Sequence, residues 1–541
     1  LLESCADHIH WGGGDWTSSR GGKGIHSEAG GGHAHAGAMI YLGDNWPDEY
    51  RQSVFTVNIH GLRVNRDLLV RQGSGYVAKH AKDFLFANDE WFRGLELKYG
   101  PDGGVFLTDW SDIGECHDYD SQDGVHRENG RIYKITYGTP RAPPADLAKL
   151  SDRELVKLEL HKNDWFVRHA GRLLQERTAA GRDMHEVHIE LRRILDGHED
   201  VTRKLRALWT LHVTGGTTAE SLFPLLNHDS EYVRGWAIRL LSEPKGRLPQ
   251  TAGANVFGKF LELAASDPSP LVRLQLAAAL QRVPPEQCWP IASALVAHHE
   301  DADDANLPLM IWYGIEPQVS RDTATAATLA GRCQIPLICR FLARRIVSQP
   351  DQTPGNSTDV PTGLVALTQV LGHTKEPAVQ KDMLAGMLDA LAGRKRVPMP
   401  RGWPALYERL VKVADVRETG TVLAVKFGDQ QAIASLQKTM MNATESADER
   451  QHAVQCLAEN GIPNLAARMH KLLGDSAVRG AAIRALASCS DDTTPQLVLG
   501  HYASFTETER ADAIATLATR PAHAQALLQA VENGKIPSRD L

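Results

Sequence analysis

The sequence predicts a mixed β and α protein, in which the C-terminal part of a β-propeller is followed by a HEAT-like α-solenoid. Residues 1 to about 140 are rich in Gly, His and Trp and carry short alternating apolar runs, which is the period of strands. From Ala145 the apolar residues recur at i, i+3 and i+4, which is the period of helices. A Pro-rich break, TPRAPP, separates the two patterns. We therefore expect a propeller portion over 1–138, a linker over 139–150 and helical repeats over 151–541.

Length and composition exclude several classes of protein. A chain of 541 residues is too long for one core, so more than one domain is expected. A composition that is 42% hydrophobic and 23% charged is ordinary for a globular protein. The net charge of -7 argues against nucleic acid as a partner, and no apolar run reaches the ~18 residues of a membrane span. The cysteines form no CxxC pair and no CxxCH haem-attachment motif.

Short apolar runs bounded by turn signals predict the strands of the first part. They are Ala38–Leu42, Val54–Ile59, Leu62–Leu69, Leu95–Tyr99, Val105–Trp110 and Arg131–Tyr137. The runs group into two units, each the size of a four-stranded propeller blade. Because a closed propeller needs at least ~4 blades, we expect further blades before residue 1.

Histidines gather in this predicted propeller portion. His8 and His10 are two residues apart, as are His33 and His35. On a strand, this spacing places both rings of a pair on one face. His60 follows at the end of a predicted strand. Neutral imidazoles bind metals and transfer protons, so these five residues are candidates for a site.

Acidic residues and one arginine extend the candidate site. The groups that could share a metal or a proton with the histidines are Asp109, Asp112, Glu115, His117 and Asp118. Arg93, at the start of a predicted inner strand, is expected to face the central channel and hold an anion. The run from Asp118 to Gly124 loosely resembles a calcium loop, but its acidic spacing is not that of an EF-hand, so we interpret it as a solvated turn. The alternative is that Gly-flanked His and Trp side chains fill turns and bond the backbone.

One stretch resembles a known family. GGHAHAGAMIYLGDNWPDEYR, followed by DFLFANDEWFRGLELKYGPDGGVFLTDW, GECHD and GRIYKITYG, resembles the dehydrogenase-like propeller of large bacterial proteins called membrane-bound dehydrogenase domain or haem-binding domain proteins. That propeller is similar to the soluble quinoprotein glucose/sorbosone dehydrogenases. In that family HEAT-like helices follow the propeller, and often a c-type cytochrome domain. Because this chain carries neither the early blades nor CxxCH, we expect both to lie outside it.

The resemblance implies a dehydrogenase that oxidises a sugar or alcohol in the periplasm or outside the cell. The implied cofactors are pyrroloquinoline quinone and calcium, and the implied partner is a cytochrome-type electron acceptor, with haem c only in a missing downstream domain. The catalytic candidates are then His35, Arg93 and His60. The cofactor-binding candidates are His33, His8, His10 and Asp109, and the metal-binding candidates are Asp112, Glu115, His117 and Asp118.

A recurring phrase marks the helical part. It places an Asp in a turn, then Val-Arg, then Ala and Leu at helical spacing. The Val-Arg pairs that begin at Val233 and Val272 lie 39 residues apart, close to the ~40-residue period of HEAT-like helix pairs. We predict roughly eight or nine such pairs. The valines expected in the core are Val167, Val233, Val272 and Val478, and the arginines expected to be structural are Arg168, Arg234, Arg273 and Arg479.

Two other functions remain open at this point. Propellers and HEAT arrays both serve as binding scaffolds, so the chain could bind carbohydrate or protein without catalysis. A weaker alternative is a metal-dependent hydrolase that uses the His and Asp groups with zinc or manganese.

Overall fold

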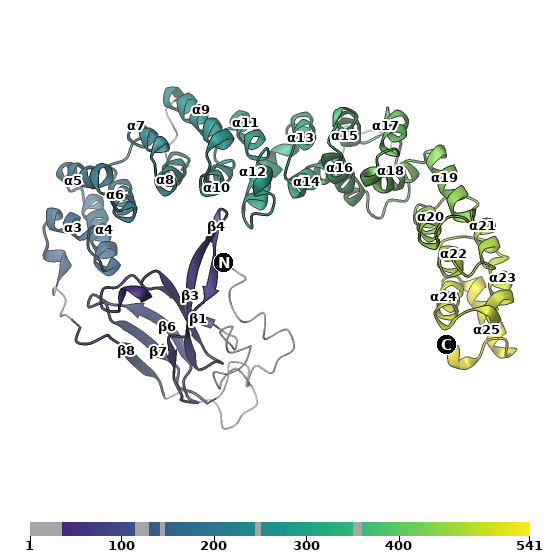
Figure 1. Cartoon of the computed structure of the whole chain (residues 1–541), viewed down its shortest axis with the longest axis horizontal. Helices are drawn as coiled ribbons and strands as arrows, with labels where there is room; N and C mark the ends of the chain where they lie inside the picture. Colours follow the sequence, from purple (N-terminus) through teal and green to yellow (C-terminus); the bar gives the residue numbers. More distant parts are fainter. Residues whose placement is uncertain (1–34, 114–128, 141–145, 244–249, 350–359) are drawn as a thin grey trace. The chain divides into compact units, whose positions relative to one another are not determined.

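The protein combines antiparallel sheets in its N-terminal part with a long helical region (Figure 1). The computed structural model describes residues 35–113, 129–140, 146–243, 250–349 and 360–541. The chain divides into two compact units, Leu1–Gln287 with Asp303–Met310, and Cys288–Ala302 with Ile311–Leu541. The predicted mixed β and α class is therefore confirmed. The strands within the described ranges do not close a propeller.

Two antiparallel sheets lie in the first unit. The first sheet has the order β1-β2-β3-β4, with β5 paired to β3, and the second has the order β6-β7-β8. The strands are β1 (His35–Ile40), β2 (Ser53–Asn58), β3 (Arg63–Gln72), β4 (Gly75–His80), β5 (Leu85–Phe86), β6 (Gly94–Tyr99), β7 (Val105–Asp109) and β8 (Arg131–Ile135). All six predicted strands are present, with ends displaced by a few residues. β4 and β5 were not predicted, since their sequences are short and lack clean alternation.

The two sheets share one apolar core. Its buried members come from both sheets and from the loops between strands: Met39, Tyr41, Trp46, Phe55, Val57, Val64, Phe92, Leu97, Val105 and Leu107. Trp46 stacks on Tyr41 and on Phe84, each with ring centroids 4.5 Å apart, and its indole nitrogen donates to the carbonyl of Ile135 at 3.1 Å. The loop after β1 is thereby fixed against both sheets. This loop includes a 3-10 turn, η2 (Asp48–Tyr50).

Helices follow the strands within the first unit. Their bounds are η3 (Leu147–Lys149), α3 (Asp152–Leu158), α4 (Asp164–Ala179), α5 (His185–Gly197), α6 (Val201–Val213), α7 (Ala219–Leu222), η4 (Phe223–Asn227), α8 (Glu231–Leu241), α9 (Gln250–Ser266) and α10 (Pro270–Ala279). Ser151 caps α3 in a capping box with Glu154. α11 (Pro285–Leu295) and α12 (Leu307–Val319) each contain a boundary between the two units.

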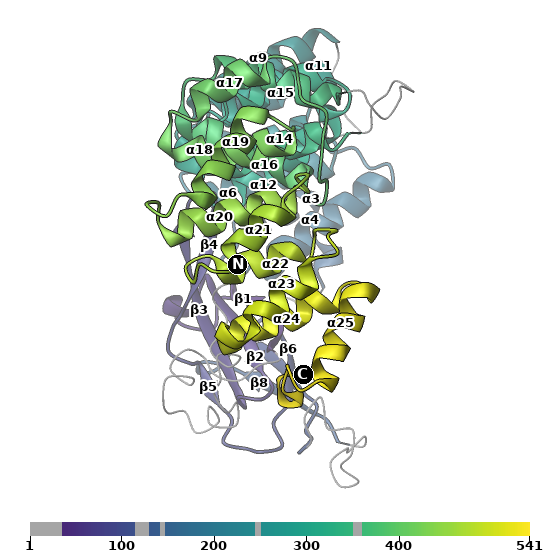
Figure 2. The same ribbon diagram turned by 90° about the vertical axis from the view of Figure 1, so that its right-hand side faces the viewer.

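The second unit is helical throughout its described residues. Its remaining elements are η5 (His299–Asp301), α13 (Thr323–Ala330), α14 (Pro336–Val347), α15 (Thr362–His373), α16 (Pro377–Ala390), α17 (Trp403–Leu410), α18 (Ala414–Lys426), α19 (Gln430–Met441), α20 (Ala447–Glu459), α21 (Ala466–Leu472), α22 (Arg479–Leu486), α23 (Thr494–His501), η6 (Tyr502–Ser504), α24 (Glu507–Ala518), α25 (Pro521–Glu532) and η7 (Ser538–Asp540). From α14 to α24 each even-numbered helix packs on the next even-numbered one. Figure 2 shows α14 beside α16. No described helix is both long and apolar enough to span a membrane.

The recurring Val-Arg phrase falls at the starts of four helices. Val167, Val233, Val272 and Val478 are all buried, as predicted. Arg234 pairs with Asp267, and Arg168 pairs with Asp164. Arg273 and Arg479 donate to the backbone carbonyls of Asp267 and Leu473. The phrase therefore places a valine in the core of each helix, and its arginines bond a nearby carboxylate or backbone carbonyl, as expected of structural residues; Arg168 does so through Nε alone.

Candidate functional site

The structure describes only part of the predicted site. His8, His10, His33, Glu115, His117 and Asp118 lie outside the described residues. The described candidates are His35, His60, Arg93, Asp109 and Asp112.

Arg93 and Asp109 serve the fold. Arg93 was expected to face a channel and hold an anion, but it is buried, and its guanidinium donates to the backbone carbonyls of Glu90, Phe92 and Ile113, each at 2.8 Å. Asp109, a predicted cofactor ligand, accepts from the backbone N–H of Arg93 at 2.7 Å and of Ser111 at 3.0 Å.

The second carboxylate oxygen of Asp109 accepts a hydrogen bond from Nε of Arg131 at 2.7 Å. These bonds tie the ends of β6, β7 and β8 together, so the Arg93 guanidinium and the Asp109 carboxylate already have structural partners.

The other described candidates lie at strand ends. His35 begins β1, and its Nε2 lies 3.3 Å from the amide nitrogen of Asn58, whose oxygen accepts from the Gly61 N–H. His60 is buried in the turn after β2, and Asp112 is buried after β7. Among the described residues, no three His, Cys, Asp or Glu side chains come together as a metal site. His35 is opposite Asn58 in the sheet, which comes two residues before His60 in the sequence, and no third ligand lies with them among the described residues.

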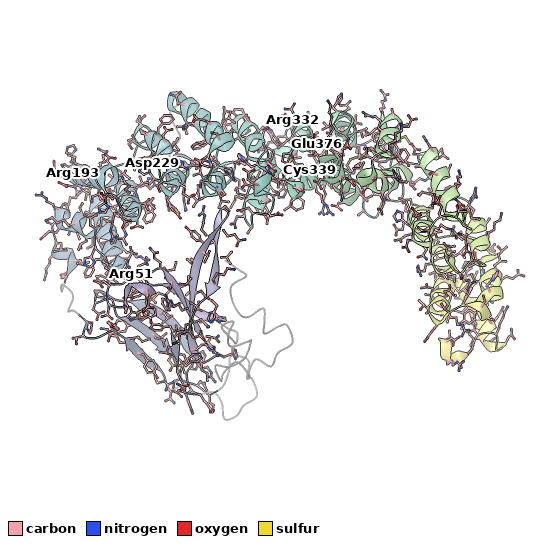
Figure 3. All side chains as sticks on the ribbon, viewed as in Figure 1. Arg51, Arg193, Asp229, Arg332, Cys339 and Glu376 are labelled. Atoms are coloured by element: carbon pink, nitrogen blue, oxygen red, sulfur yellow. The ribbon has the colours of Figure 1, made fainter. Side chains whose placement is uncertain are left out.

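A cleft of about 1010 Å³ opens elsewhere in the first unit, between the loop after β1 and helices α4 and α6. Its charged lining contains six cationic side chains, Arg51, Lys162, Arg168, Arg172, Arg203 and Arg206, and four carboxyls, Asp48, Glu159, Asp164 and Asp200. Figure 3 labels Arg51, at the edge of the sheets nearest α4. We refer to this site as the arginine cleft.

The start of α4 fixes one wall of the arginine cleft. Asn163 caps the helix by accepting from the Trp165 N–H, and its amide nitrogen donates to Asp44 Oδ1 at 3.0 Å and to the Gly100 carbonyl at 3.1 Å. The Asp164 N–H donates to the carbonyl of Leu42 at 3.0 Å. One asparagine thus satisfies a helix end and locks it onto both sheet loops.

A buried ion-pair network lines the middle of the cleft. Asp164 accepts from Nε of Arg168 and from a terminal nitrogen of Arg206, both at 2.6 Å. Arg206 also donates to the carbonyl of His161 at 3.1 Å. Because Asp164 and Arg206 are both buried, this pair holds α4 and α6 at a fixed separation.

Glu159 is the most perturbed acid of the cleft. It follows α3, is 1% exposed, and accepts a hydrogen bond from Thr210 Oγ1 at 3.0 Å. Burial raises the pKa of Glu159 to about 8, with a further rise from the charge of Asp164. Gly171 packs against this pair, since a Cβ there would lie 3.3 Å from Thr210 Oγ1 and 3.5 Å from Glu159 Oε1. At pH 7 this carboxyl is protonated and can donate a hydrogen bond.

The arginine cleft was not predicted, because the sequence indicates only that its arginines lie on the surfaces of helices. The one signal was spacing: Arg168 and Arg172 are four apart, and Arg203 and Arg206 are three apart, so each pair shares a helix face. That two such faces meet around a buried acid depends on tertiary packing.

A buried polar cluster in the first sheet was also missed. Asp83 accepts from a terminal nitrogen of Arg63 and from the amide nitrogen of Asn65, both at 2.8 Å, and Nε2 of His80 lies 3.6 Å away. The fully buried Arg63 also lies over the Phe86 ring at 4.7 Å. Arg63 and Asp83 neutralise one another beneath β5, which is a structural role.

Part of the chain resembles a described protein family. The family profile described as "Domain of unknown function (DUF7133)" matches residues 17–139. No curated protein matches the chain. Among solved structures, a chain described as a homology model of the full-length AP-3 complex in an intermediate open conformation is 14% identical with a TM-score of 0.33, covering 71% of this chain and 73% of that chain. A likeness at that TM-score supports no conclusion about function.

Proposed function

We propose that the chain is a carbohydrate-binding scaffold, in which a portion of a β-propeller is joined to a HEAT-like α-solenoid and the ligand binds in the arginine cleft. The observation that carries the proposal is the cleft itself. Its volume of about 1010 Å³ is at the upper end of the range for ligand sites. Its walls are preorganised, because Asn163 and Arg206 fix α4 against the sheet loops and α6.

The proposal of a propeller portion and a solenoid is based on the order of the strands and the packing of the helices. The order β1-β2-β3-β4 is a four-stranded antiparallel meander, which is the unit of a propeller blade. In the helical region, the packing of alternate helices from α14 to α24 and the recurring Val-Arg phrase support stacked helix pairs.

Neutral groups in the cleft suit a sugar. Gln52, Gln175 and Thr202 line it, and their side chains both donate and accept hydrogen bonds, as sugar hydroxyls do. Trp209 on α6 also lines the cleft and is 39% exposed, so its ring can cover an apolar face of a pyranose.

The test is binding by the full chain to an array of neutral and acidic oligosaccharides, followed by calorimetry on those retained. We expect saturable binding that Trp209→Ala weakens at least about tenfold, because stacking on an exposed indole is lost. Trp110→Ala is the matched control, since Trp110 is exposed but lies outside the cleft lining. Binding that is equally strong in Trp209→Ala would place the ligand elsewhere and contradict the proposal.

The dehydrogenase interpretation stays a prediction that this experiment can also decide. The same protein is supplied with pyrroloquinoline quinone, calcium and a redox dye, and each retained sugar is added. Dye reduction that depends on the sugar and the quinone, and is lost in His35→Ala, would replace the scaffold proposal with the enzyme. Sugar hydrolysis that needs zinc or manganese and no quinone would favour the hydrolase instead.

A further inference from the structure

We infer that the arginine cleft selects anionic carbohydrate, a short saccharide whose carboxylate or sulfate groups are bound by Arg168 and Arg172. This inference rests on the proposed function and adds the chemical class of the ligand.

The charge of the cleft is opposite to that of the chain. Six cationic side chains line it, against four carboxyls. Counting every carboxyl as charged, the formal charge of the lining is still +2, within a chain of net charge -7. A concave site of one sign between low-dielectric walls focuses its field and attracts an oppositely charged ligand.

Two arginines are free to make the contacts. Arg168 directs Nε to Asp164 at 2.6 Å, and Arg172 directs Nε to Glu176 at 3.1 Å. Their side chains are 66% and 65% exposed. Among the described residues the terminal nitrogens of both have no hydrogen-bond partner. Each guanidinium keeps donors in the geometry that binds a carboxylate or sulfate through two bonds.

The remaining four cations of the lining all have partners in the protein: Arg203 Nε lies 3.9 Å from Asp200, and the other three have closer partners. Arg206 bonds Asp164 and the His161 carbonyl, and Arg51 donates to the Gly43 and Lys162 carbonyls. Lys162 pairs with Asp48 at 2.6 Å. Selectivity for an anion is therefore assigned to the two exposed arginines, one helical turn apart on α4.

The neutral polar groups of the lining favour a saccharide over an acidic peptide. The Gln52 and Gln175 amides are exposed in the lining and offer donors and acceptors to a ring with several hydroxyls. Trp209 offers the apolar contact.

The experiment measures binding by the full chain to four probes: a galacturonic acid trimer, the neutral galactose trisaccharide, a sulfated galactose trisaccharide and tetraglutamate. Each is titrated by calorimetry at low and at high salt. We expect the acidic saccharides to bind at least about tenfold more tightly than the neutral one, with a preference that shrinks as salt rises. The ratio between the two acidic probes identifies carboxylate or sulfate as the better group.

The variant Arg168→Gln/Arg172→Gln separates the arginines from the rest of the cleft. It should weaken binding of the acidic saccharides at least about tenfold and weaken the neutral one much less, because only the acidic saccharides lose two charge contacts. Arg193→Gln on α5 is the matched control, because Arg193 is equally exposed, pairs with Glu190 three residues away, and lies outside the lining (Figure 3). Melting curves of both variants check that the fold is intact.

The outcomes separate the two proposals. If the neutral trisaccharide binds as tightly as the acidic ones, the choice of anionic ligand is wrong while the carbohydrate scaffold stands. If tetraglutamate binds as tightly as the trimer, the ligand is an anion without a sugar requirement and the inference fails. If no saccharide of any charge binds, here or on the array, both proposals fail.

Discussion

At the scale of single residues, some buried polar groups that the sequence suggested for a site bond the backbone instead. Arg93 was predicted to be catalytic and to face the channel, and Asp109 was predicted to bind a cofactor; both are charged and lie at strand ends. In the fold, Asp109 accepts the N–H groups of Arg93 and Ser111, which would otherwise be unpaired where the strands end. A strand end needs such acceptors whether or not the protein is an enzyme.

Glu159 gives a prediction at this scale, because its protonation is linked to folding. Its pKa rises from an ordinary 4.5 to about 8, first through burial and then through Asp164, while the Thr210 hydroxyl opposes the rise. Between these values the unfolded chain releases a proton that the folded chain keeps, so stability falls as pH rises through this window and levels off above it. We expect the first unit to lose up to about 4 kcal/mol of unfolding free energy between pH 5 and pH 9 from this group.

Urea unfolding of wild type and Glu159→Gln at several pH values measures this effect. The glutamine keeps the shape and cannot ionise, so its stability curve should lack the fall that Glu159 causes. Parallel curves for the two proteins would show that Glu159 ionises normally.

At the scale of elements, arginines that join neighbouring helices contribute different amounts of stability, depending on how buried the ion pair is. Arg234 of α8 binds both oxygens of Asp267, at 2.7 and 2.9 Å, and Asp267 is 2% exposed. Arg340 of α14 binds both oxygens of Asp389 of α16 at 2.6 and 3.0 Å, but its side chain is 51% exposed. The two ion pairs have the same geometry, but solvent screens the exposed Arg340–Asp389 pair more strongly than the buried Arg234–Asp267 pair.

We therefore expect Arg234→Ala to destabilise its unit by about 3 kcal/mol, because a buried carboxylate loses its partner. Arg340→Ala should cost less than about 1 kcal/mol. Denaturant unfolding of the full chain, followed by helical circular dichroism, measures both. Equal losses in the two variants would mean that burial does not decide the worth of these pairs.

At the scale of the first unit, the β3–β4 hairpin joins the sheets to distant helical residues. The Ser74 N–H and hydroxyl donate to the two oxygens of Asp304, each at 2.6 Å. The Tyr76 hydroxyl lies 2.6 Å from the hydroxyl of Tyr232 on α8. Gly73 allows the approach, since it has a φ of +52° and a Cβ there would overlap Asp304. The hairpin is held from outside the sheet.

Asp304→Ala should release the hairpin tip while leaving the sheet core folded. Hydrogen exchange at residues 73–76 should accelerate at least about tenfold, because local opening no longer breaks two charge-assisted bonds. The exposed neighbour substitution Asp303→Ala serves as the control. Unchanged exchange at the tip would show that the other contacts, such as the bond from Asn306 to the Ser74 hydroxyl and the Tyr76–Tyr232 pair, are enough to hold it.

Low pH should also release the hairpin tip. Burial raises the pKa of Asp304, but the hydrogen bonds from Ser74 hold this pKa below its ordinary value. The stability that the ionised carboxylate contributes is present above the unfolded pKa and is lost as pH falls through the folded value.

The sequence by itself determined the two periodicities, and with them the mixed class, the six main strands and the buried valines at Val167, Val233, Val272 and Val478. Those features follow from local spacing, because residues two apart on a strand or three to four apart on a helix share a face. The register of β4, the bonds of Arg93 and the meeting of Arg168, Arg206 and Glu159 were decided only by tertiary structure. These contacts join residues far apart in the chain, and only packing of the apolar faces sets which polar groups meet and which are sealed from water.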